Sequence, residues 1–398
     1  VPLLIKRSKS IPLEKRQNKS TPLFSFSSIK QKIGFEEEVP FDGKRVRVID
    51  LASDIFRGLR EDVKINISEA FDNAVITVPA SFSEKQRAAM RAASEKAGFT
   101  YVKLLDESTA ALWGADIKDE GKVFIVYALG GGIFTVSIFR IINGAPQALC
   151  HEGDRRLGGQ RFDGLLIHHV INVFGMDSDF RDLSYTSINK LKSLAEHLKI
   201  GLSKRDSIAV DLNTADYFDK VSENESKKNI NHVLNRTDFE KIIHNDIENT
   251  LDLTRKAIHG AGLTNNDIEA FILLGGSTKI PLVEKMIGDE FGKKIIRLPN
   301  ETILKGATAY GLQLPDPPIE RIHKPTEQGE ERVKSFDERV ALPESTLLKD
   351  KEMTWLNGLS PYLAQQLWKK GNHVEAIEHL EKLYQELPKF IGNLYYTL

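Results

Sequence analysis

Apolar and polar residues alternate most clearly from residue 74 onward. The β-branched run AVITVP predicts a strand, and Ser83 with Gln86 three positions later has the pattern of a capping box. The amphipathic helix that it opens is expected to end at Gly98. The apolar run TYVKLL then predicts a short strand, and the Ala-rich segment DESTAALWGA predicts a helix beginning near Glu107. Strands that alternate with helices indicate an α/β sheet.

Two glycine-rich turns follow buried strands further along the chain. The runs KVFIVYAL and IFTVSIFRII flank Gly130, Gly131 and Gly132, which predicts a β-hairpin with a glycine turn. The run IEAFILLGGSTKIP predicts another strand that leads into Gly275 and Gly276. Glycine lets backbone N–H groups approach a phosphate closely, although each turn alone is equally compatible with an ordinary tight turn. Their joint presence favours a nucleotide held between two lobes.

The region between these turns is predominantly helical in its pattern. Thr237 and Glu240 have the spacing of a second capping box, which predicts the start of a long helix. After the second glycine turn, Ser277 and Thr278 are candidate caps for a helix over residues 282–291.

Composition narrows the function classes only slightly. The formal net charge is -1, and no run of about 18 apolar residues occurs, so we expect neither a nucleic-acid partner nor a membrane partner. The basic stretch before residue 33 could be a nucleic-acid arm, but its aromatic residues do not interleave with its basic ones, and a solvated face is the alternative. Cys150 is the single cysteine, which excludes an intrachain disulfide and favours a reducing, cytoplasmic setting.

The C-terminal part of the chain changes character at residue 315. Residues 315–350 are rich in Pro, Glu, Lys and Arg and are expected to form a polar linker. Residues 351–398 have a helical apolar period and resemble one tetratricopeptide repeat with the start of another, with Gly371, Ala376 and Pro388 at characteristic positions. A lone helical hairpin is the alternative. Because stable repeat arrays need about three units, we expect this all-α segment to be truncated.

Six segments resemble, in order, the motifs of the DnaK-type heat-shock 70 chaperone family. They are NAVITVPASFSEKQRAAMRAASEKAG, LLDESTAALWGA, YALGGGIFTVSI, GDRRLGGQRFD, LLGGSTKIP and LPNETILKGATAYG. The resemblance covers about residues 20–314. It implies an actin-like (ribonuclease H-like) two-lobed ATPase fold over residues 1–314, with ATP or ADP and Mg²⁺ bound between the lobes. Actins and sugar kinases share only that architecture.

The resemblance also implies roles for individual residues. Lys30 is the candidate catalytic cation near the γ-phosphate and the attacking water, and Glu107 is the candidate that positions water and magnesium. Pro79 and Arg87 match a pair that relays the nucleotide state to the substrate-binding region. The alternatives are a solvated lysine, a surface glutamate, and a proline and an arginine with structural roles only.

A nucleotide site is implied by further matches. Glu196, Lys199 and Ser203 have the i, i+3, i+7 spacing of one helix face. Without the resemblance, that spacing would indicate only a solvated stripe. Lys279 stands where the family commonly has arginine, so it keeps the charge but loses a planar stacking surface. The candidate nucleotide-binding residues are Gly130, Gly131, Gly132, Glu196, Lys199, Ser203, Gly275, Gly276, Ser277, Lys279 and Asn300.

Departures from the family pattern point to weak hydrolysis. Ala128, Ile133 and Thr135 stand where the family has Asp, Thr and Asp, which removes two carboxylates and a hydroxyl from the magnesium environment. We therefore expect weakened Mg²⁺ binding, no direct metal ligand, and slow or absent hydrolysis. The family's first phosphate loop, Asp-Leu-Gly-Thr-Thr, is not found, so the fold is expected to be N-terminally incomplete.

The leading hypothesis is a DnaK-like protein that binds adenine nucleotide weakly, as a pseudo-ATPase, and binds proteins or peptides through its C-terminal repeats, with co-chaperones as further partners. An active ATP-dependent folding chaperone is one alternative. A nucleotide-independent scaffold or adaptor is the other.

Overall fold

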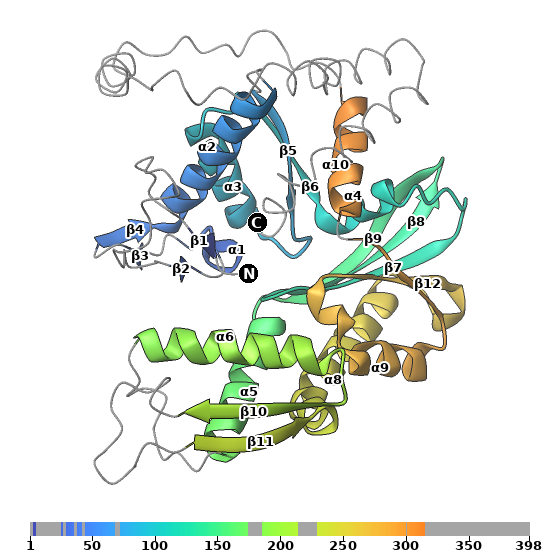
Figure 1. Cartoon of the computed structure of the whole chain (residues 1–398). Helices are drawn as coiled ribbons and strands as arrows, with labels where there is room; N and C mark the ends of the chain where they lie inside the picture. The colour runs from blue at the N-terminus through green and yellow to red at the C-terminus, as the bar shows by residue number, and fades with distance from the viewer. Residues whose placement is uncertain are drawn as a thin grey trace, which may run out of the picture. The chain divides into compact units, whose positions relative to one another are not determined.

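The computed structural model describes residues 3–4, 25–26, 29–35, 38–41, 44–67, 72–173, 185–213, 229–299 and 301–314 (Figure 1). The chain divides into two compact units. The first contains the described parts of residues 1–76, 83–105 and 307–398, and the second those of residues 77–82 and 106–306. The predicted linker and repeat segment, residues 315–350 and 351–398, lie outside the described residues.

The described residues of the first unit form short β pairs, three helices and the part of α10 (Thr302–Gln313) from Ala307 onward. The antiparallel pairs are β1 with β2 and β3 with β4, while β5 and β6 begin in this unit and end in the second. Helix α2 packs against α3. The elements are β1 (Leu3–Leu4), β2 (Ser25–Phe26), α1 (Ile29–Lys32), β3 (Glu38–Phe41), β4 (Lys44–Arg47), α2 (Val48–Ile67), β5 (Asn73–Val78), α3 (Glu84–Lys96) and β6 (Tyr101–Asp106).

Helix α3 begins and ends as its sequence predicts. The Ser83 side chain accepts a hydrogen bond from Gln86 N, and the Gln86 side chain accepts one from Ser83 N, so the capping box is confirmed. Gly98 follows the helix with φ of +96°, in the left-handed region that favours glycine. The Arg60 guanidinium fills the space beside Gly98, pairs with Asp72, and lies over the Phe99 ring. The turn from α3 into β6 is therefore fixed by side chains from α2.

A mixed sheet forms the centre of the second unit, in the order β13-β12-β7-β8-β9. Strand β12 is parallel to both β7 and β13, whereas β8 is antiparallel to β7 and β9. The predicted β7–β8 hairpin is thus confirmed, and Leu129 pairs with Phe134 as the last register pair before the glycine turn. The strands are β7 (Val123–Leu129), β8 (Phe134–Ile142), β9 (Ala145–Asp154), β12 (Ile268–Leu274) and β13 (Lys294–Arg297).

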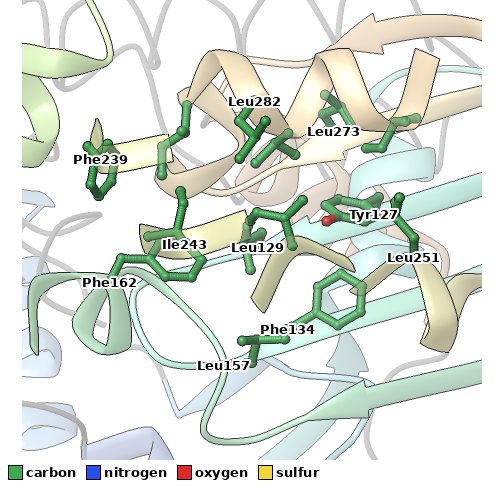
Figure 2. Packing of buried hydrophobic residues seen from close by; sticks show 14 of the residues in the cluster. Tyr127, Leu129, Phe134, Leu157, Phe162, Phe239, Ile243, Leu251, Leu273 and Leu282 are labelled. Atoms are coloured by element: carbon green, nitrogen blue, oxygen red, sulfur yellow. The ribbon is translucent and has the colours of Figure 1, made fainter. Parts of the chain in front are cut away.

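Helices of the second unit pack on this sheet through a continuous apolar core. A separate antiparallel pair consists of β10, which contacts α6, and β11, which contacts α8. Figure 2 shows side chains from β7, β8, α5, α8 and α9 interdigitating, and the Tyr127 and Phe134 rings meet edge to face with centroids 4.8 Å apart. The remaining elements are α4 (Glu107–Gly114), α5 (Gly159–Val173), α6 (Tyr185–Leu202), β10 (Ser207–Asn213), β11 (Asn229–Asn235), α8 (Arg236–Gly260), η3 (Asn265–Asp267), η4 (Gly276–Lys279), α9 (Pro281–Phe291) and α10 (Thr302–Gln313).

Helices α4 and the start of α10 cross at two glycines. A Cβ atom at Gly306 would lie 1.7 Å from Ala110 O, and one at Gly114 would lie 1.9 Å from Thr302 O. Backbone therefore touches backbone at this crossing, and any side chain would force the helices apart.

Two predicted helix caps are wrong. Helix α8 begins at Arg236 with Asn235 as its N-cap and without a side-chain cap bond, because β11 runs directly into the helix and leaves Thr237 inside the first turn. Helix α9 has Ile280 as its N-cap and Pro281 at its start. Ser277 and Thr278 instead donate their hydroxyls to the carbonyls of earlier turn residues.

The α/β class is confirmed, with a mixed sheet. In the part of the chain that the structure describes, no helix is both long and apolar enough to cross a membrane. Asn300, a predicted nucleotide-binding residue, lies outside the described residues.

Candidate functional site

The two predicted glycine turns lie together in the second unit. They follow β7 and β12, which are parallel neighbours with Leu274 paired to Ala128. The Ser277 hydroxyl, from the second turn, donates to Gly130 O in the first turn at 2.9 Å. The structure thus brings Gly130 and Ser277, which are distant in the chain, into direct contact.

The start of α5 is the third component of this arrangement. Gly159 N donates to Gly130 O at 3.0 Å, and Gln160 N donates to Gly131 O at 2.6 Å. These two N–H groups, at the first positions of the helix, are therefore used to hold the first glycine turn. Gly158, the residue before the helix, can lie against the first glycine turn only because it lacks a side chain. A Cβ atom there would lie 2.9 Å from Gly130 O.

Some glycines in the turns allow backbone contact and others face open space. Gly275 has φ of +89°, and its Cβ would lie 2.4 Å from Leu129 O, so only glycine fits there. A Cβ at Gly131 or at Gly276 would meet nothing within 4 Å. None of the hydrogen bonds among the described residues takes the N–H of Gly131 or of Gly276. Backbone N–H groups of a glycine turn that have no protein acceptor can bind an anion such as a phosphate.

Lys199 reaches the same place from α6, but its charge is already paired. Its Nζ donates to Asp163 Oδ2 at 2.8 Å and to Gly159 O at 3.1 Å, and it lies 2.7 Å from Asp163 Oδ1. Lys199 is 9% exposed and Asp163 7% exposed, so this is a buried ion pair. Burial raises the pKa of Asp163 above its ordinary value, outweighing the lowering effect of Lys199.

The other predicted residues near α6 and in η4 differ in their surroundings. Glu196 is half-buried and close enough to contribute to the raised pKa of Asp163. The Ser203 hydroxyl donates to Lys199 O at 2.8 Å, one helical turn back, so it is used within its own helix. Lys279 is exposed at the end of η4. The structure thus shows Lys199 in contact with Gly159, beside the first glycine turn, and it places Glu196 one turn earlier on the same helix.

The three positions that the sequence predicts to depart from the family pattern lie on two facing strands and in the turn between them. Ala128 of β7 is the register partner of Thr135 of β8, and Ile133 ends the turn between them, where its carbonyl accepts from Gly130 N at 3.1 Å. Side chains at paired positions lie about 5 Å apart, so carboxylates at both 128 and 135 would be neighbours. No group of three or more His, Cys, Asp or Glu residues among the described ones could hold a metal ion. The side chains of Ala128 and Ile133 carry no oxygen atom that could ligate Mg²⁺.

The remaining predicted residues are divided between the units. Lys30 lies in α1 of the first unit, and the turn after this helix packs on α3, because Gly34 has φ of +88° and leaves only 2.8 Å between a Cβ and Gln86 Cα. Arg87 follows in the first turn of α3. Pro79 is buried and Glu107 is half-buried as the first residue of α4, both in the second unit. Their action on one nucleotide stays a prediction.

Sequence reasoning missed Asp163 and the pairing of its carboxylate. The signal was present in the motif GDRRLGGQRFD, where two glycines open a helix and an aspartate follows one turn later. The sequence did not indicate that Lys199 is the partner of this carboxylate, because Lys199 is 36 residues away and reaches Asp163 through the packing of α5 against α6.

A family model for Hsp70 protein matches residues 7–314, which is more than half of the chain. The chain belongs to the Hsp70 protein family. Hsp70 proteins are chaperones with an actin-like ATPase fold that bind ATP or ADP with Mg²⁺, and they bind substrate proteins and co-chaperones. The Hsp70 match contains both glycine turns, the Lys199–Asp163 pair and every other predicted site residue.

Proposed function

We propose that this Hsp70-family protein binds adenine nucleotide through its interlocked glycine turns but hydrolyses ATP weakly or not at all. The nucleotide then acts as a conformational ligand, coupled to a protein-interaction module in residues 351–398. The observation that carries the proposal is the combination of intact turns with the apolar or neutral residues at 128, 133 and 135.

Nucleotide binding is supported by the backbone at the two turns. Among the described residues, the N–H groups of Gly131 and Gly276 have no acceptor, and they lie beside Gly130 O, which has two donors. A bound nucleotide would supply phosphate oxygens as acceptors for such groups. Glu196 and Ser203 on α6 and Lys279 on η4 are the proposed contacts to the remainder of the nucleotide.

Weak hydrolysis is supported by the paired positions Ala128 and Thr135. Phosphoryl transfer depends on positioning the nucleophile and on neutralising charge with magnesium. Magnesium in proteins is held through carboxylates and ordered waters, and a methyl group at Ala128 can hold neither. Thr135 keeps a hydroxyl but is only 4% exposed. Lys30 and Glu107 remain the candidate catalytic groups, without the two neighbouring carboxylates that would align magnesium and water.

The protein-interaction module rests on sequence alone. Residues 351–398 lie beyond the family match, and their helical period with Gly371, Ala376 and Pro388 supports a tetratricopeptide-like repeat. Peptides or proteins are the partners that such repeats bind, and co-chaperones are further proposed partners through the Hsp70 part.

A nucleotide-independent scaffold is the second candidate, and one observation favours it. The turns are already held by Gly159 N, Gln160 N, Ser277 Oγ and the Lys199–Asp163 pair, so the domain does not need a ligand to order them.

Calorimetric titration with ADP and with ATP, with and without Mg²⁺, tests the proposal together with phosphate release from the same samples. Binding with release no faster than in a Lys30→Ala control supports a pseudo-ATPase. Release well above that control would show an active ATPase, and the absence of heat at millimolar nucleotide would leave the scaffold.

A further inference from the structure

The Lys199–Asp163 pair is attached to the backbone of the candidate site. Lys199 Nζ contacts both carboxylate oxygens of Asp163 and also donates to Gly159 O at 3.1 Å. Gly159 in turn donates its N–H to Gly130 O. A continuous series of contacts therefore runs from a buried carboxylate through an ammonium and one peptide unit to the first glycine turn.

The geometry leaves little room for Lys199 to move. A Cβ at Gly159 would lie 2.9 Å from Lys199 Nζ and 2.8 Å from Ser277 Oγ, so the ammonium and the hydroxyl lie over the same glycine. Both side chains are buried, with Ser277 6% exposed. Three elements, α5, α6 and η4, thus converge on Gly159.

The charge of Lys199 is neutralised inside the protein. An ammonium with a carboxylate 2.7 Å away has little net attraction left for a phosphate, and it also donates a hydrogen bond to the Gly159 carbonyl. A direct phosphate contact would require Lys199 to leave Asp163, which would expose an unpaired carboxylate in a buried place.

We propose that Asp163 is a positioning residue of the nucleotide site, because it holds Lys199 on Gly159 and thereby fixes the first glycine turn before nucleotide arrives. Lys199 then stabilises the backbone at Gly159 and does not present its charge to the phosphate. This inference rests on the proposed nucleotide binding, which it deepens.

The test compares Asp163→Asn with Asp246→Asn in the full chain. Asp246 is a matched control, because it is also a buried carboxylate (4% exposed) paired with a residue of α5, at 2.6 Å from Arg161 Nε, but it contacts neither glycine turn. Amide hydrogen exchange of residues 158–163 is measured without nucleotide, and the affinity for ADP is measured by calorimetry.

Asp163→Asn is expected to speed exchange at the Gly159 and Gln160 amides and to weaken ADP binding at least about tenfold, since hydrogen bonds to charged groups are worth that much. Asp246→Asn is expected to change neither. Unchanged exchange at Gly159 and Gln160, or tighter ADP binding by Asp163→Asn because Lys199 is released, would overturn the proposal.

A second variant keeps the test decisive if Asp163→Asn fails to fold. The double substitution Asp163→Leu with Lys199→Met replaces the ion pair by apolar groups, which buried pairs often tolerate without loss of stability. Faster exchange at Gly159 with an unchanged melting temperature supports positioning, and unchanged exchange refutes it. Wild-type protein that binds no ADP would refute the proposed function, while the exchange data would still decide how Asp163 acts on the turn.

Discussion

Tyr127 is the clearest place to test how the core supports the glycine turn. It lies two residues before Leu129, is fully buried, and its hydroxyl contacts Thr250 Oγ1 of α8 at 2.5 Å. Thr250 donates its own hydroxyl proton to Ile247 O. Since a threonine hydroxyl has one proton, Tyr127 is the donor in the bond between them.

This assignment predicts unequal costs for two substitutions that remove the same bond. Tyr127→Phe deletes the donor and leaves Thr250 with its bond to Ile247 O, so the loss is about 1 kcal/mol of unfolding free energy. Thr250→Val deletes the acceptor and leaves the Tyr127 hydroxyl buried without a partner, which costs roughly 2 kcal/mol and up to about 3. The double variant is expected to cost about 1 kcal/mol less than the sum of the two.

Urea unfolding followed by far-ultraviolet circular dichroism measures all three variants, with the slope of the transition checked for constancy. Thr250→Val as mild as Tyr127→Phe would refute the donor assignment. If the loss of unfolding free energy in the double variant equals the sum of the losses in Tyr127→Phe and Thr250→Val, the two hydroxyls do not interact.

Three further predictions concern packing, pH and catalysis. Gly306→Ala should cost at least about 1–3 kcal/mol of unfolding free energy by overpacking the α4–α10 crossing, whereas Gly288→Ala, in α9 with open space around it, should add about 0.5–1 kcal/mol in the same urea assay. Burial raises the pKa of Tyr127 above its ordinary value of 10.0, so its contribution to stability is complete below about pH 10 and is lost as the pH rises beyond, because the unfolded state ionises first. The stability advantage of wild type over Tyr127→Phe, about 1 kcal/mol at neutral pH, should therefore fall by about 1.4 kcal/mol per pH unit above about pH 10 and change sign within about one unit, and a constant difference would contradict this. Ala128→Asp should raise Mg²⁺-dependent phosphate release above both wild type and the uncharged control Ala128→Asn, and equal rates for the three would argue against a missing carboxylate as the cause of slow hydrolysis.

Local features of the fold could be predicted from the sequence because their causes are local. The Ser83–Gln86 capping box, the glycine after α3 and the β7–β8 hairpin each depend on residues within a few positions of one another. The Thr237 prediction failed although its spacing was right, because β11 continues to Asn235 and sets where α8 starts. A long-range constraint overrode a local preference.

The site could be predicted in its parts but not in its connections. The sequence identified both glycine turns and Lys199, yet it gave Ser277 a capping role, because the Gly130 carbonyl that receives its hydroxyl is 147 residues away. The pairing of Lys199 with Asp163 and that of Tyr127 with Thr250 likewise depend on how helices pack on the sheet. Residue types indicate that a polar group needs a partner, but only the fold selects which one.

The fate of ATP bound to the protein tests the central claim most directly. The full chain is incubated with ATP and Mg²⁺ for many hours, separated from free nucleotide, and the nucleotide that remains with it is identified by chromatography. Stoichiometric, intact ATP is the predicted result. Bound ADP in its place would show that the turns support hydrolysis despite Ala128, Ile133 and Thr135, and protein without any nucleotide would show that the turns do not bind one.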